Sequence, residues 1–199
     1  MPRVIPLEAM TYLTRALEEE GAVGIAVDCV DRTPRGPRVQ FAVPMLSRPR
    51  AGTGQAPEPI LVAELVSRMV GLRWLDSPEP RVPPEDSDTA LTAAYPDVYT
   101  IPTETSPGWH FLLAATAEWI RDRGVPPGFA SSQVKQKFGT LRFYWHGGPF
   151  TEGANVQRII RTAEWVSGSV CEVCGAPGSV RPGGWIRTLC DAHDPRRAR

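Results

Sequence analysis

Four potential metal ligands lie close together near the carboxyl end of the chain. Cys171 and Cys174 form one pair, Cys190 and His193 form a second, and two residues separate the members of each pair. Thiolates and imidazoles are preferred zinc ligands, and two such pairs can complete a tetrahedron around one ion. Gly175 follows the second cysteine and suits a tight metal knuckle, because glycine readily adopts positive φ angles. The spacing therefore predicts that these four residues bind Zn²⁺.

The pattern favours a structural zinc ion over a catalytic one. A structural site uses four protein ligands, whereas a catalytic site leaves one position open for water. Residues 175–189, between the two pairs, contain no His, Asp or Glu that could act as a general base. A zinc deaminase would need His-x-Glu and a proline before its cysteine pair. Here His146 precedes two glycines, and Val170 precedes Cys171.

The residues between the ligand pairs predict a small hairpin. Its strands are expected at 179–181 and 185–189, with the glycines at 183 and 184 as the turn. Such a hairpin beside a metal site is typical of a zinc-ribbon-like finger. We expect this finger, with a basic tail, to occupy residues 169–199.

The overall composition is that of a globular protein. The chain has 199 residues, of which 42% are hydrophobic and 22% are charged, and its formal net charge is zero. Bulk electrostatics therefore gives no strong attraction to nucleic acid or to a membrane. The amino end shows no signal sequence, and no apolar run is long enough to span a bilayer. We expect a cytoplasmic protein without membrane contact, and a buried strand position for Cys29, the one cysteine outside the motif.

The first part of the chain predicts an αββα unit over residues 1–75. Apolar residues recur at helical spacing in 6–20 and again in 60–75, and they alternate in 22–30 and 38–43. In the first strand this alternation predicts that Val23, Ile25, Val27 and Cys29 share one side. Residues 76–105 form a proline-rich connector, in which 95–101 is a candidate edge strand despite Pro96.

Residues 106–168 predict a second unit of helix, strand and helix. Ser106 and Pro107 are typical of a helix start. Residues 132–138 and 140–146 alternate around Gly139, which fits either one bulged strand or a very tight hairpin. A last helix follows, with Thr151 as its cap and Gly168 as its end. The sequence thus predicts an α+β protein with small antiparallel sheets and packed helices, and it leaves open whether the two units share one sheet.

Several motifs of the second half resemble a family of small uncharacterised bacterial and prophage-encoded proteins. The similarity covers about residues 106–193 and includes Gly108-Trp109, Ala163-Glu164, Cys-x-x-Cys-Gly, Gly184-Trp185-x-x-Thr188-Leu189-Cys190 and Val134-Lys135-x-Lys137-Phe138-Gly139-x-Leu141-Arg142-Phe143-Tyr144. The family usually has Cys as its last ligand, where this chain has His193, which zinc also accepts. The resemblance implies the same folded unit and metal site, but no activity.

These features favour a non-catalytic, zinc-stabilised module that binds a protein partner, which could be related to a phage or a toxin. The finger would present Trp185 and Arg187, because aromatic and arginine side chains dominate protein interfaces. Lys135, Lys137 and Arg142 on the neighbouring strands would extend this binding surface. The oligomeric state is left open.

Two alternatives have weaker support in the sequence. A nucleic-acid-binding role would use the arginines between 158 and 199 together with Trp165 and Trp185. An enzyme would use His146 as a general base, with His110, Tyr144, Arg142 and Glu104 as further candidates. The chain has no nucleophile elbow, phosphate loop or dinucleotide fingerprint, so an enzyme is the less favoured interpretation.

Overall fold

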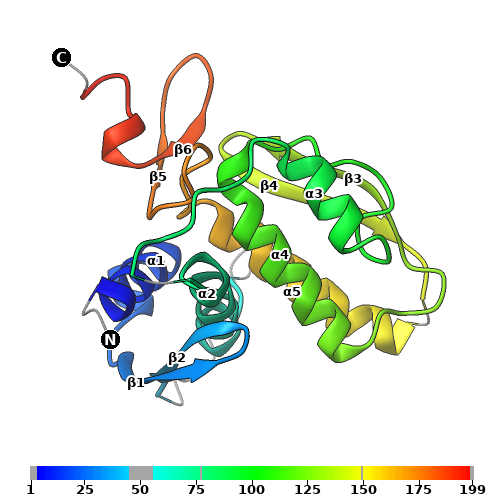
Figure 1. Cartoon of the computed structure of the whole chain (residues 1–199), viewed down its shortest axis with the longest axis horizontal. Coiled ribbons are helices and arrows are strands. Elements are labelled where there is room, and N and C mark those ends of the chain that lie inside the picture. Colours follow the sequence, from blue (N-terminus) through cyan, green and yellow to red (C-terminus); the bar gives the residue numbers. More distant parts are fainter. Residues whose placement is uncertain (1–3, 45–55, 77, 149, 198–199) are drawn as a thin grey trace.

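The computed structural model describes residues 4–44, 56–76, 78–148 and 150–197. They form an α+β fold, as predicted (Figure 1). Over the described residues the strands pair into three antiparallel sheets of two strands each, so the two predicted units do not share a sheet. None of the described helices is both long and apolar enough to cross a membrane.

The first unit consists of α1 (Val4–Gly21), β1 (Ala26–Thr33), β2 (Gly36–Ala42) and α2 (Pro59–Arg73). One face of α1 buries Ile5, Ala9 and Tyr12 at helical spacing. The hairpin turn packs closely on α2, because a Cβ added to Gly36 would lie only 2.0 Å from the Gly71 carbonyl oxygen. Glycine is thus required at the turn, which also has a φ of 92°.

Between the units lies α3 (Ser87–Ala94), so part of the expected connector is helical. The candidate edge strand at 95–101 is wrong, because this segment forms turns rather than pairing with a sheet. Tyr99 within it is fully buried, and its hydroxyl donates to the Leu113 carbonyl over 2.7 Å. The buried Tyr99 ring therefore holds residues 95–101 in place without backbone pairing to a sheet.

The second unit consists of η1 (Pro107–Trp109), α4 (His110–Arg123), β3 (Ala130–Lys137), β4 (Thr140–His146) and α5 (Phe150–Ser167). The tight hairpin is the correct alternative, since Lys137 pairs with Thr140 across a two-residue turn. Phe138 and Gly139 in that turn have φ angles of 54° and 76°, as a type I′ turn requires. The turn leaves Phe138 exposed. The expected helix cap Thr151 lies outside the residues whose side chains are described.

The two units repeat each other. Their hairpins have the same register: Ala26 pairs with Ala42 as Ala130 pairs with His146, and a bulge follows the second residue of each first strand. Before the strands, Gly24 and Gly128 have φ angles of 77° and 71°. Ala-Glu-x-Val-Ser-x-x-Val occurs at residues 63–70, within α2, and again at 163–170, where it begins in α5 and runs past its end at Ser167. The fold is therefore built from two αββα units of one plan.

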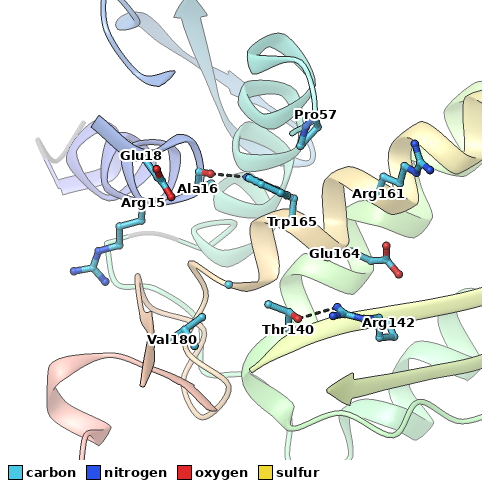
Figure 2. Close-up of a pocket in the computed structure, with 11 residues that line it drawn as sticks. Arg15, Ala16, Glu18, Pro57, Thr140, Arg142, Arg161, Glu164, Trp165 and Val180 are labelled. Carbon is cyan, nitrogen blue, oxygen red and sulfur yellow. Dashed lines mark hydrogen bonds between the residues drawn. The ribbon is translucent and has the colours of Figure 1, made fainter. Parts of the chain in front are cut away.

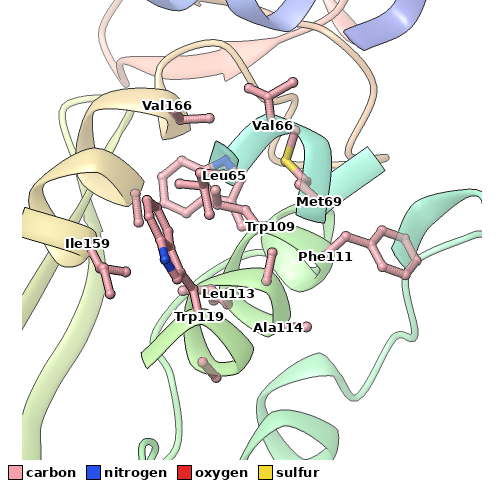
Figure 3. Close-up of a cluster of buried hydrophobic side chains, with 14 of the residues drawn as sticks. Leu65, Val66, Met69, Trp109, Phe111, Leu113, Ala114, Trp119, Ile159 and Val166 are labelled. Carbon is pink, nitrogen blue, oxygen red and sulfur yellow. The ribbon is translucent and has the colours of Figure 1, made fainter. Parts of the chain in front are cut away.

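One hydrophobic core joins the two units. Figure 3 shows Leu65 and Met69 from α2 beside Trp109 and Leu113 near the start of the second unit, with Val166 from α5. The helix α4 is buried on nearly all sides, because α2, α5 and α3 all pack against it. The core is thus mainly helical, and the hairpins cover its outside.

The prediction for Cys29 is wrong, because its side chain is exposed. The alternation of the first strand is interrupted by the bulge between Val27 and Cys29. A bulge inserts one residue and turns the following side chains to the other face. Val30 therefore packs against the core in place of Cys29. Val23, predicted on the same side as Val27, is exposed and lies before β1.

Candidate metal centre

The four predicted ligands converge on one point. One ligand atom from each of Cys171, Cys174, Cys190 and His193 lies within 4.8 Å of the other three. Cys174 Sγ and Cys190 Sγ are 3.8 Å apart, which matches the ~3.8 Å expected for two thiolates on a tetrahedral zinc with bonds of about 2.3 Å. His193 Nδ1 lies 3.2 Å from Cys190 Sγ and 3.7 Å from Cys171 Sγ. The four side chains can therefore hold a single metal ion.

Short local structures position these ligands. Cys171 follows α5 after a tight turn, and Gly175 adopts a φ of 72°, as a metal knuckle needs. The predicted hairpin is present as β5 (Ser179–Arg181) and β6 (Arg187–Leu189), although the second strand is shorter than the predicted 185–189 and Trp185 lies in the bend before it. Cys190 follows β6 directly, and η2 (Asp191–His193) returns the imidazole toward the sulfurs. The neighbouring Cys174 thiol is the main influence that lowers the pKa of Cys171, against the opposing effect of burial.

The knuckle is bonded to both αββα units. From the first unit, the Tyr12 hydroxyl donates to the Gly175 carbonyl, and Arg73 Nη1 donates to the Cys174 carbonyl over 2.9 Å. From the second unit, the Trp109 indole donates to the Val170 carbonyl over 2.9 Å. The finger is therefore part of the main body rather than a module on a tether.

Gly108 makes the closest approach between the body and the knuckle. Its N–H donates to the Glu172 carbonyl over 2.8 Å, and an added Cβ would lie 2.2 Å from the Cys171 carbonyl oxygen. No larger residue fits without displacing the backbone that carries the ligands. Gly108 is one of the residues in the family resemblance, but spacing alone gave no reason to connect it with the metal site.

Glu172, between the first two ligands, is a buried structural residue that the sequence analysis missed. Its side chain is 2% exposed. One oxygen accepts the Thr188 N–H over 2.8 Å, and the other accepts Arg187 Nε over 3.1 Å. Gln136 from β3 reaches it over 3.4 Å. The carboxylate thus ties β6 and β3 to the knuckle, and Arg187 is partly committed to it.

The predicted binding residues do not lie together: three border two different cavities, and the two lysines border neither of these. Trp185 is 77% exposed and, with Arg187, borders a cavity of 520 Å³ beside Glu104 and Gln136. Arg142 instead borders a cavity of 790 Å³ on another part of the molecule. The two lysines of β3 lie over aromatic rings, with Lys135 Nζ 5.9 Å from the Tyr144 ring centre and Lys137 Nζ 5.5 Å from that of Phe138.

Most arginines of the finger are paired within it. Arg181 and Arg197 bind Asp191, Arg196 binds Asp194, and Arg187 binds Glu172. These pairs reduce the positive charge available to phosphates. Nothing in this arrangement therefore adds support for nucleic-acid binding.

The candidate catalytic residues do not assemble into one site among the described residues. His146 is exposed at the end of β4, and no hydrogen bond joins its ring to another described residue. His110 Nδ1 lies 3.0 Å from Ser87 Oγ, and burial lowers the pKa of this histidine. Glu104 accepts hydrogen bonds from Gln133 and pairs with β3 through its backbone.

A scan against protein-family models, a search of curated proteins and a search of solved structures each found no match.

Proposed function

We propose that the chain is a zinc-stabilised, non-catalytic binding module whose partner is another protein. The observation that carries the proposal is the closed set of three sulfurs and one imidazole, all within 4.8 Å of one another. Zn²⁺ is the ion that best suits this donor set, because thiolates favour it and it accepts tetrahedral geometry without preference from its d electrons. Four protein ligands leave no position open for a reacting water.

The proposed partner surface is the outer part of the finger around Trp185. This indole is 77% exposed, and hydrogen bonds to Glu172 hold β6 and the neighbouring Arg187 in place. Trp185 lies in the bend just before this held strand, and exposed tryptophans are enriched among interface hot spots.

Metal analysis of the purified protein tests the first half of the proposal. We expect one zinc per chain, and loss of both metal and folded protein for Cys171→Ser or Cys190→Ser. Cys29→Ser is the matched control, since Cys29 is exposed and belongs to no ligand pair. Soluble, folded Cys171→Ser protein with its full metal content would contradict the assignment.

The partner surface is tested by affinity capture from the native host with folded, zinc-loaded protein. Trp185→Ala should fail to capture a protein that the wild type captures. Once purified, this partner should bind the wild type at least tenfold more tightly than it binds Trp185→Ala. Val23→Ala is the control, because Val23 is also well exposed (66%) but lies before β1. Equal binding by wild type and Trp185→Ala would exclude this surface.

A further inference from the structure

A second candidate site lies between the two units and the finger. It is a cavity of 790 Å³ bordered by α1, β4, α5 and β5, and Figure 2 shows the side chains around it. Its polar border includes three arginines, Arg15, Arg142 and Arg161, and two glutamates, Glu18 and Glu164. None of these residues belongs to the metal centre or to the Trp185 surface.

The three arginines differ from most others in the described chain. Most arginines elsewhere in the described residues pair with carboxylates, as Arg38 does with Glu64 and Arg121 with Asp97. Among the described residues, Arg15, Arg142 and Arg161 form no ion pair within 4.0 Å. Their guanidinium groups therefore keep donors available for a ligand.

The repeat explains why Arg142 has no ion pair. Arg38 and Arg142 occupy the same position in the two hairpins, and Glu64 and Glu164 occupy the same position in the following helices. In the first unit Arg38 Nη2 lies 2.9 Å from both oxygens of Glu64. In the second, Glu164 Oε1 instead accepts the Phe143 N–H over 2.9 Å. This leaves Arg142 to donate to Thr140 and to the Leu141 carbonyl at the border of the cavity.

The cavity also has a fixed apolar wall. The Trp165 indole N–H donates to the Ala16 carbonyl, which holds the ring in place, while 40% of the residue is exposed. Val180 of β5, 45% exposed, borders the same space. A ligand could therefore contact arginines with one part and an apolar surface with another.

From this geometry we propose that the cavity binds a small organic molecule carrying several negatively charged oxygens, as in a phosphate ester or a tricarboxylate. The border carries three positive groups against two carboxylates, one of which already accepts a backbone N–H. Guanidinium groups bind oxyanions through paired, charge-assisted hydrogen bonds. The cavity volume lies within the range of ordinary small-molecule sites.

The test is titration calorimetry of the zinc-loaded full chain with ADP, pyrophosphate and citrate as probes. Binding of ADP and pyrophosphate without citrate would identify phosphate recognition, whereas tighter binding of citrate would identify carboxylate recognition. Arg142→Gln and Arg161→Gln should each weaken the binding probe about tenfold or more, because each removes a charge-assisted contact. Arg32→Gln and Arg123→Gln remove the same charge from exposed arginines outside the cavity and should leave binding nearly unchanged.

Two results would overturn the proposal. One is no heat and no thermal stabilisation with any of the three probes at millimolar concentration. The other is equal weakening by Arg142→Gln and Arg32→Gln, which indicates general charge attraction. Trp185→Ala should keep full anion affinity, so this test succeeds or fails independently of the proposed protein partner.

Discussion

The two αββα units share a hairpin register and a helix motif, but they close the edges of their hairpins differently. In the second unit, the Leu141 N–H donates to Ser167 Oγ on α5 over 2.8 Å. In the first unit, the position of Leu141 is taken by Pro37, which has no N–H. The hydroxyl of Ser67, the counterpart of Ser167, is buried without a hydrogen-bond partner among the described residues.

This difference shows that units of one plan can close the edges of their hairpins by different contacts. In the second unit, side chains of α5 occupy the free edge of β4, and α5 then continues directly into the metal knuckle. Covering an edge strand also protects it from pairing with other chains. In the first unit, the corresponding carboxylate, Glu64, joins an ion-pair cluster with Arg38 and Arg68. The first unit is thus closed by charge pairs, and the second keeps an arginine-lined cavity.

Removal of the metal should give the largest effect and tests whether the two units are coupled. The knuckle accepts hydrogen bonds from Tyr12 and Arg73 of the first unit and from Gly108 and Trp109 of the second. Binding free energy of a structural zinc is largely folding free energy. Chelation should therefore lower the melting temperature of the whole chain, followed by circular dichroism, and not only that of the finger. The coupling would be absent if near-ultraviolet signals of the buried tryptophans stayed unchanged after chelation.

A matched pair of serine substitutions should give the next largest effect. Ser167→Ala leaves the buried Leu141 N–H without its acceptor, and such an unsatisfied group costs about 1–3 kcal/mol of unfolding free energy. Ser67→Ala removes a buried hydroxyl that has no partner, so it should be neutral or slightly stabilising. Urea denaturation of both variants at the same pH measures the contrast. Equal losses in the two variants would mean that the units do not differ at this edge.

The sequence predicts the metal ligands, most helices and the first long hairpin, because these depend on local spacing and periodicity. For residues 132–146 it leaves a bulged strand and a tight hairpin as alternatives. It does not reveal the repeat, since the shared residues are few and most of the match lies in register and in φ angles at Gly24 and Gly128. The bulge that exposes Cys29 depends on pairing with a distant strand. Glu172 was missed because its partners, Arg187 and Thr188, come together only when the finger folds.

The smallest expected effect is on the pH dependence of the unfolding free energy. Glu64 and Glu164, the matched glutamates of the two units, should change it in opposite directions. Burial alone would raise the pKa of Glu64, but hydrogen bonds from Arg68 and Arg38 outweigh it and hold the pKa below its ordinary value. Burial raises the pKa of Glu164, and the Phe143 N–H offsets this only in part. Ionised Glu64 therefore stabilises the fold above its unfolded pKa of about 4.3, and this contribution is lost as the pH falls through its folded value. Glu164 behaves oppositely, because the fold favours its neutral form, so protonation contributes stability as the pH falls.

The measurement is urea denaturation of the wild type, Glu64→Gln and Glu164→Gln at neutral pH and near pH 4. Glu64→Gln should lose up to about 1 kcal/mol at neutral pH, since Glu64 is partly exposed and such ion pairs contribute little. This difference between Glu64→Gln and the wild type should shrink near pH 4, because Glu64 of the wild type becomes protonated there and loses its charge. Relative to the wild type, Glu164→Gln should become less stable in acid, because the wild-type carboxyl gains stability there and glutamine cannot. Parallel pH profiles for the two variants would show that the equivalent carboxylates have the same environment, and the contrast between paired Arg38 and unpaired Arg142 would then lose its physical basis.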